Sequence, residues 1–144
     1  MGGTAVAWLR HRKAYHQMIE ALFNQPNMMA AKKLLDVSVL RHEAIASNLA
    51  NLETPNYKRL DVSREFETQL QQAIGTRDTH RLNGMTPQIG VDKTAVASRR
   101  DGNTVDFEKE LVHLNRNGVE HAVESHVITG ALLKLRLAIT GRAA

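Results

Sequence analysis

The chain of 144 residues contains no cysteine and few aromatic residues. Without cysteine there are no disulfide bonds, no cysteine-ligated zinc sites and no thiol nucleophile. Aromatic residues make up only 4% of the sequence, which is less than a compact monomer of this size usually buries. Long helices that pack against neighbours need fewer aromatics, because Leu, Ile, Val and Ala fill the seam between helices. The composition therefore favours a helical unit that packs against neighbours.

The sequence also lacks a hydrophobic run long enough to span a membrane. The apolar run at residues 5–9 is shorter than the core of a signal peptide, and the basic residues follow it. If the protein leaves the cytoplasm, we therefore expect export without a cleaved signal peptide of that kind. The net charge of +4 is small and spread along the chain, which indicates a solvated surface more than a nucleic-acid footprint.

Three stretches carry the apolar periodicity of helices. Residues 4–23 place four apolar side chains on one face, which are Trp8, Tyr15, Ile19 and Leu22. The sequence "NQPN" at 24–27 interrupts this pattern, because Pro26 disfavours helix at Gln25, and Asn27 can cap the next helix. The second stretch is 28–52. The third is 104–140, with Asn103 or Thr104 as its expected cap.

The second and third stretches have near-heptad stripes that must be buried against something. The first stripe follows Leu35, Val39, His42, Ala46 and Leu49. The second contains Leu111, Leu114, Ile128, Leu132, Leu135 and Ile139, with a weak middle at Gly118, His121 and Ser125. We therefore predict a mainly α fold in which two long terminal helices pair as a coiled-coil-like unit. Neighbouring subunits would cover the apolar surface that this pairing leaves open.

The region between these helices, residues 61–103, is expected to be irregular and partly mobile. A short helix is predicted over 62–74, where Phe66, Leu70 and Ile74 share a face. After Gly75 the sequence is polar and broken by glycine and proline, which indicates an extended connection with short strand pieces near Gln88–Val91.

No pattern of catalytic or metal-binding residues stands out. The sequence has no phosphate-binding glycine loop and no nucleophile-elbow motif. His11 and His16 are five residues apart, as are His121 and His126, and five helical steps separate side chains by about 140°. The acidic pair Glu108 and Glu110 is best explained as complementing a helix dipole. We therefore expect no catalytic residue, no metal, no cofactor and no small-molecule substrate.

The stretch "ASNLANLETPNYK" (46–58) is unusual, because it combines side-chain amides with apolar residues and then stops at a proline. It resembles the N-terminal signature of the flagellar basal-body rod protein family. The assembly motif that the resemblance marks consists of Ala46, Asn48, Leu49, Ala50, Asn51, Thr54, Pro55, Asn56, Tyr57 and Lys58. Asn56 stands where the family has Gly, and Asn tolerates the left-handed turn that Gly adopts there.

A second stretch, "DGNTVD", resembles the start of the C-terminal helix in the proximal rod members of that family, and other rod and hook proteins lack it. Its residues are Asp101, Gly102, Asn103, Thr104, Val105 and Asp106. The resemblance covers about residues 18–140. It divides the chain into an N-terminal helical rod motif (18–60), a middle region (61–103) and a C-terminal helix (104–144). Residues 1–17 lie outside it, as an extension or an upstream start.

The resemblance implies a non-enzymatic structural subunit of the rod that crosses the periplasm. Its partners would be other copies of itself, other rod proteins, the rod–ring junction protein and the export gate. At the helix end, the amides of Asn48 and Asn51 are expected to satisfy the last carbonyls and to reach a neighbouring chain, and Thr54-Pro55 stops the helix.

An alternative is a small basic helical module that binds nucleic acid or acts as an adaptor. The basic stretches 57–64 and 98–100 are the features that favour it.

Overall fold

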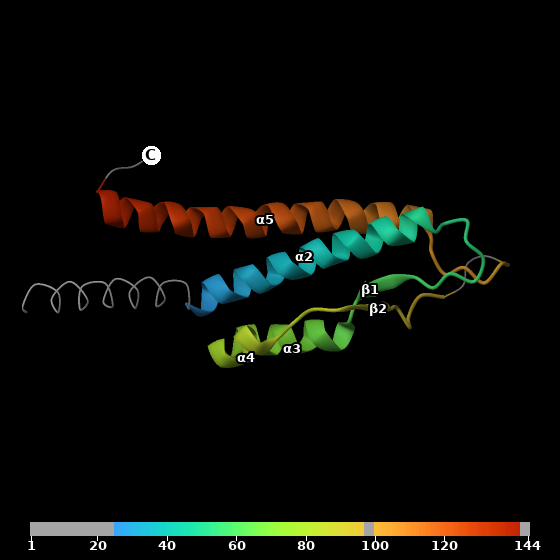
Figure 1. The fold of residues 1–144 in the computed structure, drawn as a ribbon, viewed down its shortest axis with the longest axis horizontal. Helices are drawn as coiled ribbons and strands as arrows, with labels where there is room; N and C mark the ends of the chain where they lie inside the picture. Colours follow the sequence, from blue (N-terminus) through green and yellow to red (C-terminus); the bar gives the residue numbers. More distant parts are fainter. Residues whose placement is uncertain (1–24, 97–99, 142–144) are drawn as a thin grey trace, which may run out of the picture.

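The computed structural model describes residues 25–96 and 100–141, and these form a mainly α structure (Figure 1). The expected helix at 4–23 and the extension at 1–17 lie outside the described residues. The elements in chain order are α2 (Pro26–Ala50), β1 (Leu60–Val62), α3 (Arg64–Gly75), α4 (Thr79–Gly84), β2 (Ile89–Val91) and α5 (Phe107–Thr140). None of the helices in the described ranges combines the length and the apolar content that crossing a membrane requires.

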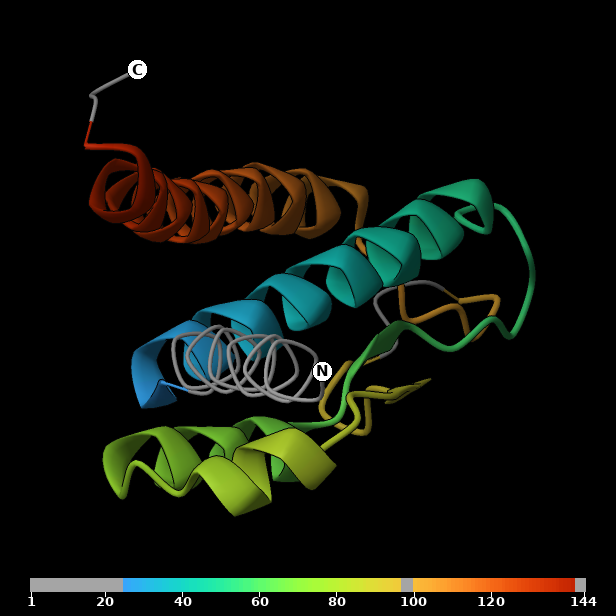
Figure 2. The ribbon, with the colours of Figure 1, turned by 60° about the vertical axis from the view of Figure 1, so that its left-hand side comes forward.

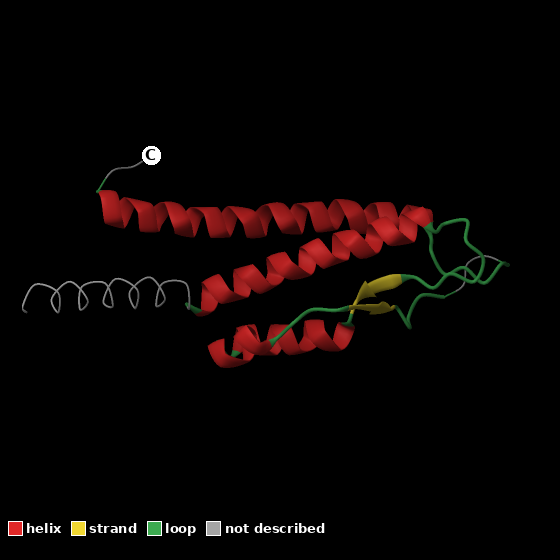
Figure 3. Cartoon of the chain, in the orientation of Figure 1, coloured by secondary structure: helices red, strands yellow, loops and turns green. Residues whose placement is uncertain are grey.

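The two long helices α2 and α5 pack against each other, which confirms the predicted pairing (Figure 3). They run in opposite directions, as the colours along the sequence show (Figure 1). The 25 residues of α2 rise about 37 Å and the 34 residues of α5 about 51 Å. The C-terminal end of α2 meets the N-terminal end of α5, as the hydrogen bond from Asn48 to Glu110 demonstrates.

Both helices begin one or more residues away from the predicted caps. In α2, Pro26 occupies the first turn and Gln25 is extended (φ −64°, ψ 136°), so Asn27 is not the cap. Proline fits this position because its missing N–H has no partner in the first turn of a helix. In α5 the cap is Asp106, and neither Asn103 nor Thr104 has that role. The carboxylate of Asp106 accepts hydrogen bonds from the backbone nitrogens of Glu108 and Lys109.

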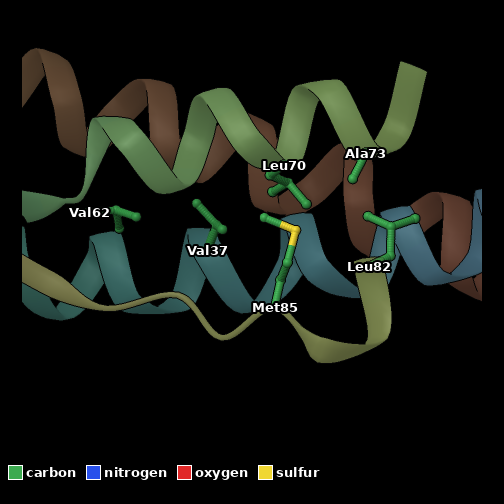
Figure 4. Close-up of a cluster of buried hydrophobic side chains, with 6 residues drawn as sticks. All are labelled: Val37, Val62, Leu70, Ala73, Leu82 and Met85. Atoms are coloured by element: carbon green, nitrogen blue, oxygen red, sulfur yellow. The ribbon is translucent and has the colours of Figure 1, made fainter. Parts of the chain in front are cut away.

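The middle region is more ordered than predicted. Strands β1 and β2 pair antiparallel, with Asp61 opposite Gly90, and they join α3 and α4 in a middle lobe that packs on α2. Figure 4 shows the buried cluster between α2 and this middle lobe, which consists of Val37, Val62, Leu70, Ala73, Leu82 and Met85. The predicted helix over 62–74 and the strand near Gln88–Val91 are confirmed.

The extended connection expected after Gly75 is interrupted by one element that was not predicted, helix α4. Helix α4 was missed because six residues are too few to display an apolar period. Asp78 caps this helix by accepting a hydrogen bond from the Arg81 nitrogen at 2.9 Å. Leu82 then anchors it in the cluster with complete burial.

The side chains that pack between α2 and α5 differ from the predicted apolar stripes. On both helices the inward positions are shifted by one residue toward the N-terminus of the chain. On α2 the inward positions are Ser38, Arg41, Ile45 and Asn48, and on α5 they are Glu110, Asn117 and Glu124. Most of these are polar, so a search for apolar periodicity selects the adjacent stripe instead. The Asn117 side chain, for example, donates to the Ser38 carbonyl at 2.8 Å.

Consequently, no predicted seam residue is fully buried within the chain. Leu35, Leu114, Ile128 and Leu135 are half-buried, whereas the exposed fractions are 45% for Val39, 38% for Leu111, 42% for Leu132 and 68% for Ile139. Their packing against other subunits therefore stays a prediction.

Candidate assembly site at the junction of the two motifs

The structure brings the two sequence motifs together, although about 50 residues separate them in the chain. The Asn56 nitrogen donates to the Asp101 carbonyl at 2.9 Å, and the Thr104 nitrogen donates to the Tyr57 carbonyl at 3.1 Å. The Lys58 ammonium reaches the Gly102 carbonyl at 2.9 Å. The loop after α2 and the loop before α5 thus form one junction at the end of the helical hairpin (Figure 1).

Asn103 is the centre of this junction. Its fully buried side-chain nitrogen lies 2.9–3.1 Å from three backbone carbonyl oxygens, those of Asn51, Leu52 and Thr54. Its side-chain oxygen accepts from the Val105 nitrogen at 2.8 Å. Carbonyls at and just beyond a helix C-terminus lack intrahelical partners, so Asn103 satisfies groups that α2 leaves open.

The amides of the first motif divide into two roles. Asn51 satisfies a carbonyl of the last turn of α2, as predicted, because its side-chain nitrogen donates to the Ser47 carbonyl at 2.9 Å. Asn48 does not, since it contacts β1 and α5. Its oxygen accepts from the Leu60 nitrogen at 2.8 Å, and its nitrogen donates to the Leu60 carbonyl at 2.8 Å and to Glu110 Oε2 at 3.2 Å. Because Asn48 is completely buried, its amide is not available to a neighbouring chain, contrary to expectation.

The turn that follows α2 has the left-handed conformation expected at Asn56, whose φ is 60°. Gly102 also has a positive φ, of 77°, and it lies directly against this turn. A Cβ atom at Gly102 would come 2.6 Å from Asn56 Oδ1. The side chain that replaces the family glycine is therefore accommodated by a second glycine on the other motif.

A buried charge cluster behind the junction was missed by the sequence analysis. Arg59 Nε donates to Glu110 Oε1 at 2.6 Å, and Arg59 Nη1 donates to Asp61 at 2.7 Å and to Asp92 at 2.9 Å. Burial alone would lower the pKa of Arg59, but the hydrogen bonds to Asp61 and Glu110 outweigh it and raise the pKa. Glu110 lies in the first turn of α5, as the interpretation of its helix-dipole role requires, but it is only 1% exposed and also binds Arg59 and Asn48.

This cluster gives part of the basic stretch 57–64 an internal role, since Arg59 and Lys58 both bind groups of the same chain. The only sequence signal for the cluster was an arginine that follows the motif and an acid one turn into α5. Two such residues are too common to predict a contact.

The other motif residues are divided between the interior and the surface. Thr104 and Val105 are buried, and the Thr104 hydroxyl accepts from the Arg59 nitrogen at 2.8 Å. Leu49 and Tyr57 are half-buried, and the exposed residues are Ala46, Ala50, Thr54, Pro55 and Lys58. The exposed ones form the part of the motif that another molecule can contact. Within the described ranges, no group of three or more His, Asp or Glu side chains is placed to hold a metal ion.

No family model matches the chain. The similar curated proteins, in contrast, all belong to one family. The flagellar basal body rod protein FlgB of Borrelia hermsii is 30% identical over 115 residues, which cover 67% of this chain and 83% of that protein. FlgB of Aquifex aeolicus is 31% identical over 114 residues, which cover 78% of this chain and 91% of that protein. FlgB of Escherichia coli K12 is 25% identical over 117 residues, which cover 70% and 83%. Taken with the junction of its two motifs, these matches establish that the chain belongs to the FlgB family of flagellar basal body rod proteins.

Proposed function

We propose that this protein is a structural subunit of the proximal rod of the flagellar basal body, and that it self-assembles through its terminal helices to serve motility. Its partners are other copies of itself, other rod proteins, the rod–ring junction protein and the export gate. It reaches the periplasm-spanning rod without a cleaved signal peptide. The names of its relatives support the rod, and the features below support the mode of assembly.

One observation carries the assembly proposal: the predicted seam residues form an apolar face that the described chain leaves open. On α5, the side chains that face the middle lobe include His113, Arg116 and Glu120. Helical geometry places Leu111, Leu114 and Leu132 on the other side of the inward-facing positions of α5, away from His113, Arg116 and Glu120. On α2, the same argument places Leu35, Val39 and Leu49 on that side. These six residues, here called the outer face, lie side by side on the two helices, away from the middle lobe.

The polar seam explains why the outer face is not used inside the chain. Two of the inward polar side chains of α5 have specific partners on α2: Asn117 donates to the Ser38 carbonyl, and Glu110 accepts from the Asn48 amide. Polar contacts of this kind fix the register of two helices but contribute little hydrophobic stabilisation. The apolar surface left outside is available to the helices of other subunits.

A substitution on the outer face tests the proposal. Val39→Glu changes a side chain that is 45% exposed, so we expect the free subunit to keep its helical content and its unfolding free energy to within about 1 kcal/mol. Packed between helices in a rod, the same carboxylate would be buried without a partner, which costs several kcal/mol. We therefore expect loss of the protein from isolated basal bodies and loss of swimming.

Val96→Glu is the matched control, because Val96 is 83% exposed in the loop after β2. It makes the same chemical change away from the outer face and should leave assembly and swimming intact. If Val39→Glu protein is incorporated into basal bodies at the normal level, the outer face is not the assembly surface. The nucleic-acid alternative is less favoured in the basic stretch 57–64, since Lys58 and Arg59 bind groups of their own chain.

A further inference from the structure

A groove of about 840 Å³ lies along α2, between α5 and the middle lobe, on the side opposite the outer face. Figure 2 shows this arrangement, with α2 between α5 and the pair α3–α4. The apolar part of its lining includes Leu34, Val37 and Leu70. Six carboxylates also line it, against four cationic side chains, so the groove combines apolar surface with an excess of acid. The carboxylates are Asp61, Glu65, Glu67, Asp92, Glu120 and Glu124.

Two buried oxygen atoms of residues that line the groove lack a hydrogen-bond partner. Asn117 is only 2% exposed, and its nitrogen donates to the Ser38 carbonyl, but its Oδ1 has no donor among the described residues. Glu124 Oε2 is also buried, and nothing in the described ranges donates to it. Both side chains reach Ser38, since a hydrogen bond joins Ser38 to the Glu124 carboxylate. Both open atoms are acceptors, so the group that completes this site must donate hydrogen bonds.

A cation suits this site better than a neutral donor. Arg41 already binds three carboxylates of the lining, those of Asp61, Glu67 and Glu120, which leaves Glu124 without an ion pair among the described residues. Burial raises the pKa of Glu124, and the hydrogen bond from Ser38 offsets this only in part. An ammonium group has three donors and no acceptor, so it matches the open oxygens of a carboxylate and an amide.

The last two turns of α5 have the matching chemistry. The sequence after Glu124 contains no acidic residue, whereas Lys134 is exposed on α5 and has no ion-pair partner among the described residues. Helical spacing places Ala131, Leu137 and Ala138 around Lys134, and Leu137 is 46% exposed. This face of α5 is therefore apolar with one cation at its centre, which complements a groove with apolar lining and unpaired acid.

The end of α5 projects beyond α2 and cannot reach the groove of its own chain. Asn48 pairs with Glu110, and both helices rise about 1.5 Å per residue, so Pro26 is level with about residue 132. Residues 133–140 therefore extend past the start of α2, as Figure 1 shows. Lys134 lies ten residues beyond Glu124 on one helix, about 15 Å along its axis, and the four-carbon stem of a lysine cannot span that distance. A contact between the two requires two copies of the chain.

We propose that the end of α5 of one copy, residues 133–140, docks in the groove of a second copy, with its Lys134 at Glu124 and Asn117. The eight residues rise about 12 Å, which is close to the rise of about 10 Å along the groove-lining part of α2, from Leu34 to Arg41. Two different surfaces meet, so the contact is head-to-tail and can repeat from copy to copy.

This contact adds a second interface to the assembly through the outer face, and it rests on the proposed function. Lys134 and Leu132 are two residues apart, which separates them by about 200° around α5. Docking of the Lys134 face therefore leaves the outer face free for other helices.

Cross-linking of two differently tagged full-length chains tests the docking. The native sequence has no cysteine, so one chain carries Ala138→Cys and the other Gln71→Cys as its only thiol. Ala138 is exposed beside Lys134, and Gln71 is exposed on α3 in the lining of the groove. We expect oxidation of the mixture to give the mixed disulfide in about fivefold excess or more over either disulfide between identical chains.

Charge variants test the contact itself. Lys134→Glu in the Ala138→Cys chain should lower the yield of the mixed disulfide about fivefold or more, because a carboxylate would then meet the acidic groove. Arg136→Glu makes the same charge change about 200° round α5 and should leave the yield within about twofold. Glu124→Gln in the Gln71→Cys chain should also lower the yield, and it should weaken the effect of Lys134→Glu.

Three outcomes would overturn the docking. The first is a mixed disulfide no more abundant than those between identical chains, although both thiols react with a maleimide. The second is an equal loss with Lys134→Glu and Arg136→Glu, which would indicate net charge without a docking face. The third is the same effect of Lys134→Glu on the native groove and on the Glu124→Gln groove, which would place Lys134 elsewhere.

Val39→Glu separates this contact from the proposed function. Present in both chains, it should leave the mixed disulfide intact, because Val39 lies on the outer face. In isolated basal bodies, Lys134→Glu should lower incorporation and Arg136→Glu should not. If no mixed disulfide forms but Val39→Glu still prevents incorporation, the groove contact fails and the proposed function stands. If the mixed disulfide forms but Val39→Glu and Lys134→Glu proteins are both incorporated normally, the assembly proposal fails and the groove contact is restricted to free subunits.

Discussion

Asn48 on α2 and Glu110 on α5 are joined by a hydrogen bond of 3.2 Å inside the helix seam, and both side chains are buried from solvent. The same Asn48 amide pairs with both backbone groups of Leu60. One side chain therefore holds the hairpin to the start of the middle lobe. A residue of the recognition motif thus has a role inside the fold.

Asn48→Asp should destabilise the protein by about 3 kcal/mol at pH 7, because it removes two donated hydrogen bonds and sets a second carboxylate beside Glu110. Glu110 would raise the pKa of the new acid in the folded state. The loss is then largest above the unfolded value of about 3.9 and shrinks as the pH falls. Urea unfolding at pH 7 and pH 4 measures it. Asn115→Asp, on the exposed side of α5, should change stability by less than about 0.5 kcal/mol.

Arg59→Met should cost about 3–5 kcal/mol, because it leaves Glu110 buried without its cation. Adding Glu110→Gln should restore part of this loss, since the double variant contains no uncompensated charge at Glu110. A double-mutant cycle by urea unfolding measures the coupling. Arg116→Met removes an arginine from an exposed ion pair with Glu120 and should cost no more than about 0.5 kcal/mol. Additive losses for Arg59→Met and Glu110→Gln would disprove the coupling.

Gly102→Ala should destabilise the junction by about 2 kcal/mol, because its φ of 77° is strained for alanine and the new Cβ meets Asn56 Oδ1. Asn56→Gly should by itself stay within about 1 kcal/mol, since glycine also suits the left-handed turn. In that background Gly102→Ala should cost less, as the obstructing oxygen is gone. Thermal unfolding of the four proteins tests this.

Gly118→Ala is the matched control for Gly102→Ala. Gly118 is an exposed glycine inside α5, and a Cβ added there would meet no other group of the described residues within 4 Å. Alanine there should stabilise the helix by about 0.5–1 kcal/mol. An equal cost of Gly102→Ala with and without Asn56 would rule out the contact between the two motifs as its cause.

Asp92→Asn should cost about 1–2 kcal/mol at pH 7. Burial alone would raise the pKa of Asp92, but hydrogen bonds from Thr94 and Arg59 outweigh it and lower the pKa below its ordinary value. A carboxylate whose folded pKa is lowered contributes stability above the unfolded pKa of about 3.9, and this is lost as the pH falls through the folded value. The difference between the two proteins should therefore disappear in acid.

Urea unfolding at pH 7, 5 and 3 tests the Asp92→Asn prediction. Asp36→Asn, on the exposed side of α2, is the control and should change stability at pH 7 by less than about 0.5 kcal/mol. A difference for Asp92→Asn that is the same at all three pH values would show that ionisation of Asp92 does not contribute.

Much of the fold could be predicted because it depends on local signals. The long period of α2 and α5, the face of Phe66 and Leu70 on α3, and the left-handed turn at Asn56 each follow from residues close in sequence. Helix α4 escaped prediction because it is only six residues long and relies on burial of Leu82 by α2 and α3. The charge cluster escaped because Arg59, Asp92 and Glu110 come from three distant parts of the chain.

Residues close in sequence were enough to predict helices α2, α3 and α5 and to mark the two motifs, because backbone propensity and capping act within a few residues. Which face of each helix turns inward depends instead on contacts between elements that are distant in sequence. Polar side chains such as Ser38, Asn48 and Asn117 can be buried once a partner is within hydrogen-bond distance, and that partner lies on another element. The seam is therefore polar, and the apolar stripes that the sequence displays remain on the surface.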